Sequence, residues 1–139
     1  HVRGGGDRVV TFEEFRDLVA ELVDEVPEEF MRGLQGVHVL PQAKLEEGWE
    51  DEDVYRMGEY LDPGPEHFLG GQPGLGRHIA IYYGSFKAIA DADPDFDWEE
   101  EAWETLTHEL RHHVESLAGE DLLVQEDMAF FDELERRGR

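Results

Sequence analysis

The sequence predicts an α+β domain, and two observations carry this prediction. Three segments repeat apolar residues every three or four positions, which is the period of an amphipathic helix. Short runs rich in β-branched and aromatic residues lie between these segments and are typical of strands. The 139 residues suffice for one domain with a modest core, so we expect a flexible segment over residues 1–10 and a single domain over 11–139.

The first helix is expected to begin at Thr11, because Thr11 and Glu14 have the spacing of a capping box. Pro27 should end this helix and start a further helical turn, which Gly33 and Gly36 should then break. The apolar face of the helix is formed by Phe12, Phe15, Leu18, Val19, Leu22, Val23 and Val26. This face is expected to pack against the core.

Strands are predicted over residues 37–40, 54–61 and 78–83. Pro41 closes the first strand and Gly84 closes the last, because neither residue suits the interior of a strand. The stretches between the strands are acidic or rich in Pro and Gly, and are expected to be loops. A helical turn is expected over residues 86–90.

The longest helix is predicted over residues 98–118, a stretch without Pro or Gly. Asp97 and Glu100 have capping-box spacing at its start, and Gly119 gives a C-terminal stop. Its apolar face is formed by Trp103, Leu106, Leu110, Val114 and Leu117. A last helix is expected over residues 125–137.

The long helix contains the pentapeptide His108-Glu109-Leu110-Arg111-His112, which has the H-E-x-x-H pattern. Two histidines four residues apart lie one helical turn from each other on the same face, so both imidazoles can reach one zinc ion. Glu109 lies about 100° around the helix from His108 and about 60° from His112, near enough to act on a metal-bound water without being a ligand. The pattern therefore indicates a metal-dependent hydrolase with one Zn²⁺ ion.

The composition restricts the partners. Lys and Arg number 12 against 35 Asp and Glu, and the formal net charge of −23 argues against nucleic acid and anionic membranes. The chain has no cysteine, so any zinc must be held by histidine and carboxylate. No apolar run approaches the roughly 20 residues that span a bilayer, and no leader pattern is present at the start. We therefore expect a cytoplasmic protein that binds neither nucleic acid nor membrane.

Segments spread over most of residues 11–136 resemble a known family. They include Val26-Pro27-Glu28-Glu29-Phe30, Ile79-Ala80-Ile81-Tyr82-Tyr83-Gly84 and Thr107-His108-Glu109-Leu110-Arg111-His112-His113. With its doubled histidine, the chain resembles the minimal zincin-like proteins, a family of small bacterial zinc metallopeptidases. The resemblance implies a small mixed β-sheet packed on an N-terminal helix and a metal-binding motif helix, followed by a C-terminal helix. It also implies a strand that runs beside the metal cleft.

The chain departs from the family pattern at two places. Arg111 is charged where zincin helices usually carry an uncharged residue. Many relatives have Gly and Asp three and six residues after the second motif histidine, whereas this chain has Glu115 and Ala118 there. The third metal ligand is therefore open.

Three ligands from one straight helix would crowd one side of the ion, so we expect the third ligand from another element. Asp127 is our first choice, with Glu126, Asp121 and Glu115 as alternates. Glu115 could instead orient an imidazole from outside the ligand shell. The acidic start of the last helix is also explained by the helix dipole alone.

The strand expected beside the cleft supplies the substrate-side candidates Tyr82, Tyr83 and His78. A hydroxyl or imidazole at this place can stabilise the oxyanion of a tetrahedral intermediate, although packing also explains the tyrosines. An extended peptide could bind along residues 79–83 by β-augmentation. His113 falls among the apolar residues of the helix, so we expect it to be buried and bonded to backbone rather than to metal.

The function that follows is a zinc-dependent metallopeptidase, in which a zinc-activated water attacks the peptide bond with Glu109 as general base. The partner would be a peptide or protein, with basic ones favoured by the acidic chain. The alternative is a zinc-stabilised peptide- or protein-binding module without efficient catalysis, since so small a domain offers little wall around a cleft. A helical interaction protein with an accidental motif would bind no metal.

Overall fold

The computed structural model describes residues 10–46, 48, 54–62, 76–119 and 125–136, and only the backbone of 125–127. Within these residues the element order is α1 (Phe12–Asp24), η1 (Glu28–Phe30), β1 (Leu34–Leu40), β2 (Gly58–Leu61), β3 (Arg77–Tyr82), α2 (Tyr83–Ala92), α3 (Trp98–Gly119) and α4 (Gln125–Arg136). The order of helices and strands confirms the predicted α+β class.

The described strands form one mixed sheet in the order β1-β3-β2. β1 runs parallel to β3, and β2 runs antiparallel to it. β3 is therefore the middle strand, with both of its edges paired. The expectation that an extended peptide binds along residues 79–83 is wrong, because no backbone edge of this strand is open.

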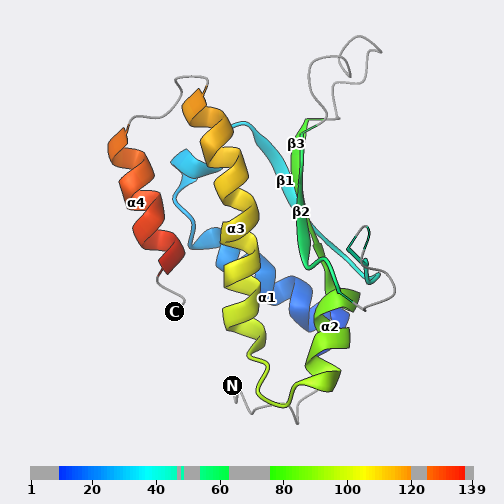
Figure 1. Cartoon of the computed structure of the whole chain (residues 1–139). Helices are drawn as coiled ribbons and strands as arrows, with labels where there is room; N and C mark the ends of the chain where they lie inside the picture. The colour runs from blue at the N-terminus through cyan, green and yellow to red at the C-terminus, as the bar shows by residue number, and fades with distance from the viewer. Residues whose placement is uncertain (1–9, 47, 49–53, 63–75, 120–124, 137–139) are drawn as a thin grey trace.

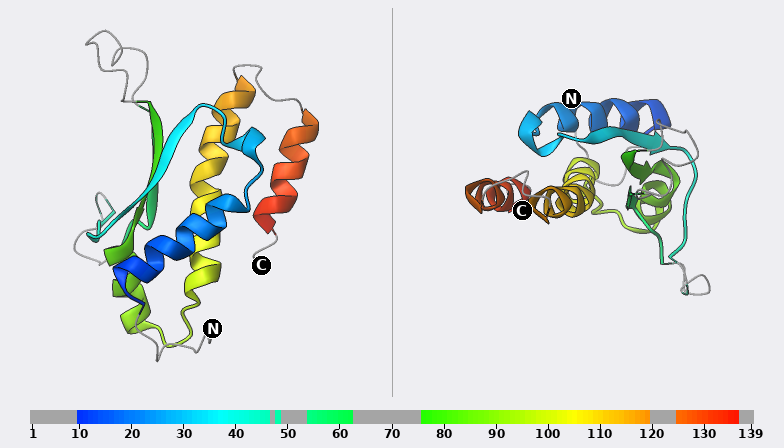
Figure 2. Two further views of the ribbon diagram at one scale, coloured as in Figure 1. Left: turned by 180° about the vertical axis from the view of Figure 1, so that it is seen from behind. Right: turned by 90° about the horizontal axis from the view of Figure 1, so that it is seen from above.

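The helices α1 and α3 pack on the same face of the sheet, and α4 lies against the far side of α3 (Figures 1 and 2). The two helices and the sheet share one core, whose fully buried members include Phe15, Leu22, Ile79, Ile81, Leu106, Leu110 and Val114. Because side chains alternate along a strand, β3 turns Ile79 and Ile81 toward α1 and α3 and its other side chains toward the opposite face, the open face, on which α1 and α3 do not pack. Ala80 and Tyr82 are nevertheless buried on that face.

The predicted helix starts are confirmed by their hydrogen bonds. The Thr11 hydroxyl accepts from the backbone of Glu14, and the Glu14 carboxylate accepts from the backbone of Thr11. At α3 the Asp97 carboxylate accepts from the backbone of Glu100 at 3.1 Å. These caps satisfy backbone donors that a helix start would otherwise leave without partners.

Two element boundaries differ from the predictions. Gly36 does not break the chain but lies inside β1, which starts at Leu34 and has an irregular register between these two residues. Tyr83 does not end β3 but begins α2, which extends to Ala92. The sheet pairing supplied by β3 in the first case, and tertiary packing in the second, override the local preferences of glycine and tyrosine.

Gly84 is required by the close passage of another backbone segment. A Cβ atom at this position would lie 2.6 Å from the carbonyl carbon of Gln42 and 2.9 Å from the Cα of Ala43. The Gly84 N–H also donates to the Gln42 carbonyl at 3.2 Å. The junction between β3 and α2 therefore has no room for a side chain.

We expect Gly84→Ala to destabilise the fold by about 1–3 kcal/mol, because backbone atoms must move to admit the methyl group. The measurement is the free energy of unfolding from denaturant titration. Gly119→Ala is the matched control, since no described atom lies within 4 Å of a Cβ atom at that position. Equal stability of the two variants would contradict the prediction.

Candidate metal centre

The helix α3 presents His108 and His112 on its solvent side. Their ring centroids lie 5.5 Å apart, with an angle of 83° between the ring planes. Both residues are exposed, whereas Leu106 and Leu110 on the other side are fully buried. Packing of the apolar face thus orients the two imidazoles outward from one helical turn.

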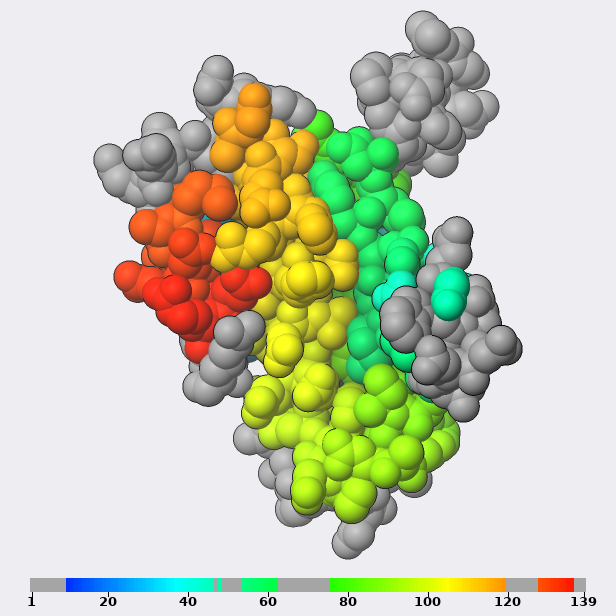
Figure 3. Space-filling model, viewed as in Figure 1, coloured from blue at the N-terminus to red at the C-terminus, as the bar shows by residue number. Residues whose placement is uncertain are grey.

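The exposed surface of α3 lies between β2 on one side and α4 on the other (Figure 3). The approach of β2 is close at Gly58, where a Cβ atom would lie 2.8 Å from the Thr105 methyl carbon and 3.3 Å from Cγ of Glu109. A glycine at this position lets the edge strand pack directly against the motif helix.

Glu109 is partly buried between α3 and β2. Burial raises the pKa of its carboxyl group above the ordinary value, and the charges of His108 and His112 only partly oppose this rise. The backbone N–H of Tyr60 donates a hydrogen bond to the carboxylate, which also acts to lower the pKa. Glu109 therefore has a defined position and an enhanced affinity for a proton.

Tyr60 of β2 also contacts the two histidines that end the motif. Its ring stacks on His112, with centroids 6.4 Å apart and planes 18° from parallel. Its hydroxyl oxygen lies 2.9 Å from Nδ1 of His113. One residue of the edge strand thus touches Glu109, His112 and His113.

His113 is completely buried, as predicted. Its Nε2 lies 2.6 Å from the carbonyl oxygen of Arg32. The expectation that this histidine bonds to backbone in the interior is confirmed.

The charged Arg111 of the motif faces α4. Its guanidinium donates to Asp132 and Glu135, with the Nε bond to Glu135 measuring 3.0 Å, and it lies over the ring of Phe131. The departure from the usual uncharged residue is explained by this contact, which joins α3 to α4.

The structure does not complete the set of metal ligands. Glu115 is exposed and its carboxylate lies 3.9 Å from Arg111. Asp121 and the side chains of Glu126 and Asp127 lie outside the described residues. Among the residues that are described, no group of three His, Asp or Glu is arranged to hold a metal ion. Asp127 as third ligand stays a prediction.

The two motif histidines nevertheless suit zinc by their chemistry. Imidazole nitrogen is a preferred zinc ligand, and a catalytic zinc site takes three protein ligands and keeps one position open. Within the described part of the chain, no hydrogen bond or ion pair engages the ring nitrogens of His108 or His112. Two imidazoles of the kind that zinc binds are therefore present and exposed on one helix face.

The substrate-side candidates do not lie beside the motif, which corrects that expectation. His78 and Tyr82 point to the open face of the sheet, where His78 lies 3.0 Å from His38 and Tyr82 donates to Glu59. Tyr83 donates to the carbonyl of Val10 and packs among aromatic residues of α1 and α3. The alternation of side chains along β3 and the start of α2 separate all three from the motif residues of α3.

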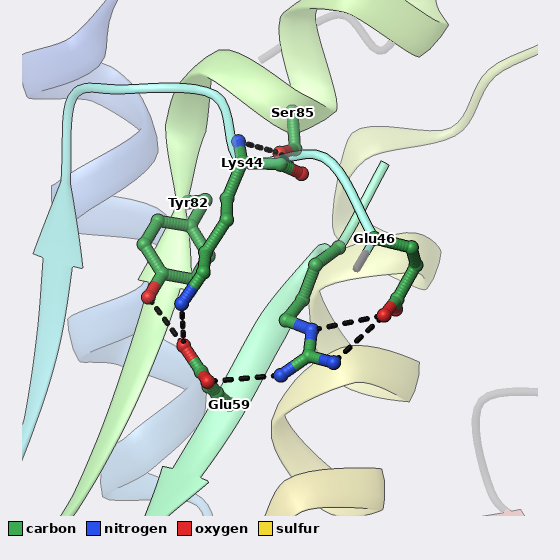
Figure 4. Close-up of polar contacts among 6 residues, drawn as sticks. Lys44, Glu46, Glu59, Tyr82 and Ser85 are labelled. Carbon is green, nitrogen blue, oxygen red and sulfur yellow. Dashed lines mark hydrogen bonds and ion pairs between the residues drawn. The ribbon is translucent and has the colours of Figure 1, made fainter. Parts of the chain in front are cut away.

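A network of charges occupies that open face (Figure 4). Glu59 accepts from Lys44 at 2.7 Å, from Tyr82 at 2.6 Å and from Arg56 at 2.9 Å. Burial acts to raise the pKa of Glu59, but these hydrogen bonds outweigh it and leave the pKa below its ordinary value. Arg56 also binds Glu46 through two nitrogens, so the segments before β2 and after β1 are joined.

Comparison with known proteins identifies the family of the chain. The model of the zincin-like metallopeptidase family matches residues 34–129. A solved structure, described as a conserved hypothetical protein from Thermo thermophilus, is 62% identical and has a TM-score of 0.68. That match covers 79% of this chain and 99% of the other. No curated protein matches the chain.

The chain belongs to the zincin-like metallopeptidase family, which confirms the resemblance drawn from the motif segments. The family typically uses zinc as its cofactor. None of the helices in the described ranges is both long enough and apolar enough to cross a membrane.

Sequence reasoning missed Tyr60 and Gly58 as residues of the site. The strand that contains them was predicted, but strand order decides which strand lies beside α3, and order depends on long-range pairing. The only local signal was the Gly-x-Tyr pattern, which places both residues on one face of a strand.

We expect Arg111→Leu to loosen α4, because two carboxylates of α4 lose their partner. These ion pairs are partly exposed, with 29% of the Arg111 side chain accessible, so the expected loss is only about 1 kcal/mol. Amide hydrogen exchange in α4 should become about fivefold faster. Lys87→Leu, which breaks the pair with Asp91 inside α2, should leave exchange in α4 unchanged.

The pH dependence of the free energy of unfolding should show the contribution of the Glu59 carboxylate. Its pKa is lowered in the folded protein, so its contribution is present above the unfolded pKa and is lost as the pH falls through the folded pKa. Glu59→Gln should cost about 1 kcal/mol at pH 7, and the difference from the parent should shrink on acidification below about pH 4.5. Unfolding titrations across this range measure both proteins. Glu133→Gln, at an exposed position of α4, should show no such trend.

Proposed function

We propose that this protein is a zinc-dependent peptidase that hydrolyses peptide bonds, with Glu109 as general base. The observation that supports the proposal most directly is the arrangement of Glu109 beside two outward-facing histidines. The carboxylate is partly buried, is bonded to the Tyr60 amide and has a raised pKa. A positioned carboxylate with a raised pKa is suited to accept a proton as a general base.

The motif residues of α3 would have two different roles, zinc binding and proton transfer. His108 and His112 would hold the zinc ion, with Asp127 as the proposed third ligand and Glu126, Asp121 and Glu115 as alternates. A bound zinc ion supplies Lewis acidity, which makes water a nucleophile at neutral pH. Glu109 would accept the proton of the attacking water and return it to the leaving amine.

The edge of β2 is the place where an extended peptide would bind. The Tyr82 N–H donates to the carbonyl of Met57, so in the antiparallel ladder the backbone groups of Gly58 and the carbonyl of Tyr60 point away from β3. The Tyr60 N–H also points outward and donates to Glu109. Strand addition at this outer edge would bring a peptide bond alongside the motif. The net charge of −23 favours a basic peptide or protein as substrate.

A second candidate is a zinc-stabilised binding module without efficient catalysis. The exposure of both histidines supports it, because little of the described chain encloses the site and excludes water. Removal of zinc by a chelator would then lower the melting temperature of a protein that cleaves no peptide.

We expect Glu109→Gln to keep one zinc ion per chain and to lower peptide cleavage by at least about a hundredfold, because the general base is lost while both imidazoles remain. Elemental analysis and cleavage of a peptide library that includes basic sequences measure the two properties. His108→Ala and His112→Ala should each lose the zinc.

The controls separate the two candidates. Glu104→Gln changes an exposed carboxylate one helical turn before His108 and should leave zinc content and cleavage unchanged. Full activity of Glu109→Gln would refute the mechanism. Zinc in the parent, together with no cleavage by parent or variants, would favour the binding module.

A further inference from the structure

We infer that Tyr60 is the positioning residue of the metal site and that His113 serves the site by holding Tyr60. The inference rests on the proposed function only in taking His112 as a zinc ligand. It assigns a role to the second histidine of the doubled pair, which is buried and does not face the metal.

The contacts of Tyr60 come from three different parts of one residue. Its backbone N–H donates to Glu109, its ring stacks on His112 and its hydroxyl bonds to His113. Tyr60 lies opposite Ile79 in the paired strands β2 and β3. One residue of the edge strand thus contacts three residues of the motif helix.

The direction of the hydrogen bonds at His113 is determined by their chemistry. The carbonyl oxygen of Arg32 can only accept, so Nε2 of His113 donates to it across 2.6 Å. In a neutral imidazole Nδ1 is then the acceptor, and the hydroxyl of Tyr60 donates to it. Because His113 is completely buried, this chain of bonds restricts rotation of the phenol ring.

The restricted ring of Tyr60 helps to orient the imidazole of His112. Its ring is exposed, and no hydrogen bond in the described part of the chain orients it. Two ring contacts limit its rotation: the stacked ring of Tyr60, with centroids 6.4 Å apart, and the edge-on ring of His108, with centroids 5.5 Å apart. A residue outside the ligand shell that orients a ligating histidine typically contributes about 10–100-fold to metal affinity.

The test compares two tyrosine variants that each lose one hydroxyl hydrogen bond. Tyr60→Phe should weaken zinc binding at least about tenfold, measured by competition with a chromophoric chelator. Tyr82→Phe loses the bond to Glu59 on the open face of the sheet and should bind zinc within about twofold of the parent. Equal zinc affinity of the two variants would overturn the inference.

A second variant and a second measurement keep the inference testable if a variant is unstable or if the parent binds no zinc. Tyr60→Leu removes the ring but keeps the backbone N–H, and should bind zinc more weakly than Tyr60→Phe. In the metal-free protein, Tyr60→Phe should shift the ring resonances of His112 in NMR spectra and leave those of His38 in place. Unchanged His112 resonances would overturn the inference, even for a parent that binds no zinc.

These readouts do not depend on catalysis. Absence of peptide cleavage would overturn the proposed function and leave the role of Tyr60 standing. Conversely, an active parent whose zinc affinity is unaffected by Tyr60→Phe would overturn the role of Tyr60 alone.

Discussion

The packing of β2 against α3 is the contact on which the candidate site depends. Gly58 has no side chain, so the strand approaches the helix at Thr105 and Glu109 without obstruction. This approach buries part of Glu109 and brings a backbone donor to its carboxylate. Without the strand, the motif would be two histidines and a solvated glutamate on an exposed helix face, with ordinary proton affinity.

Much of the fold follows from local patterns in the sequence. The capping box at Thr11, the N-cap at Asp97 and the apolar repeat of α3 predict helices that the structure confirms. These features involve residues only three or four positions apart, so a single segment determines them. The motif residues on α3 were predictable for the same reason.

The strand that lies beside the motif helix was not predictable from local patterns. The strand predicted over residues 78–83 has the strongest β-propensity and was expected beside the cleft, yet it is the middle strand. A strand in the middle of a sheet is usually its most apolar strand. The apolar pattern that identifies residues 78–83 as a strand therefore also indicates that this strand has no free edge for a peptide. The short strand that carries Tyr60 gives only a weak local signal, and its position depends on pairing with β3.

The buried bonds of His113 also settle which of two neighbouring imidazoles can act as a chelating group. Adjacent histidines on a helix point about 100° apart, so the helix would have to turn by about that angle to exchange them around an ion. Exchange here would break the bonds to Arg32 and Tyr60 inside the core, at a cost of about 1–3 kcal/mol for each polar group left without a partner. The sequence has two adjacent histidines at the end of the motif, but the helix exposes only His112 to a metal ion.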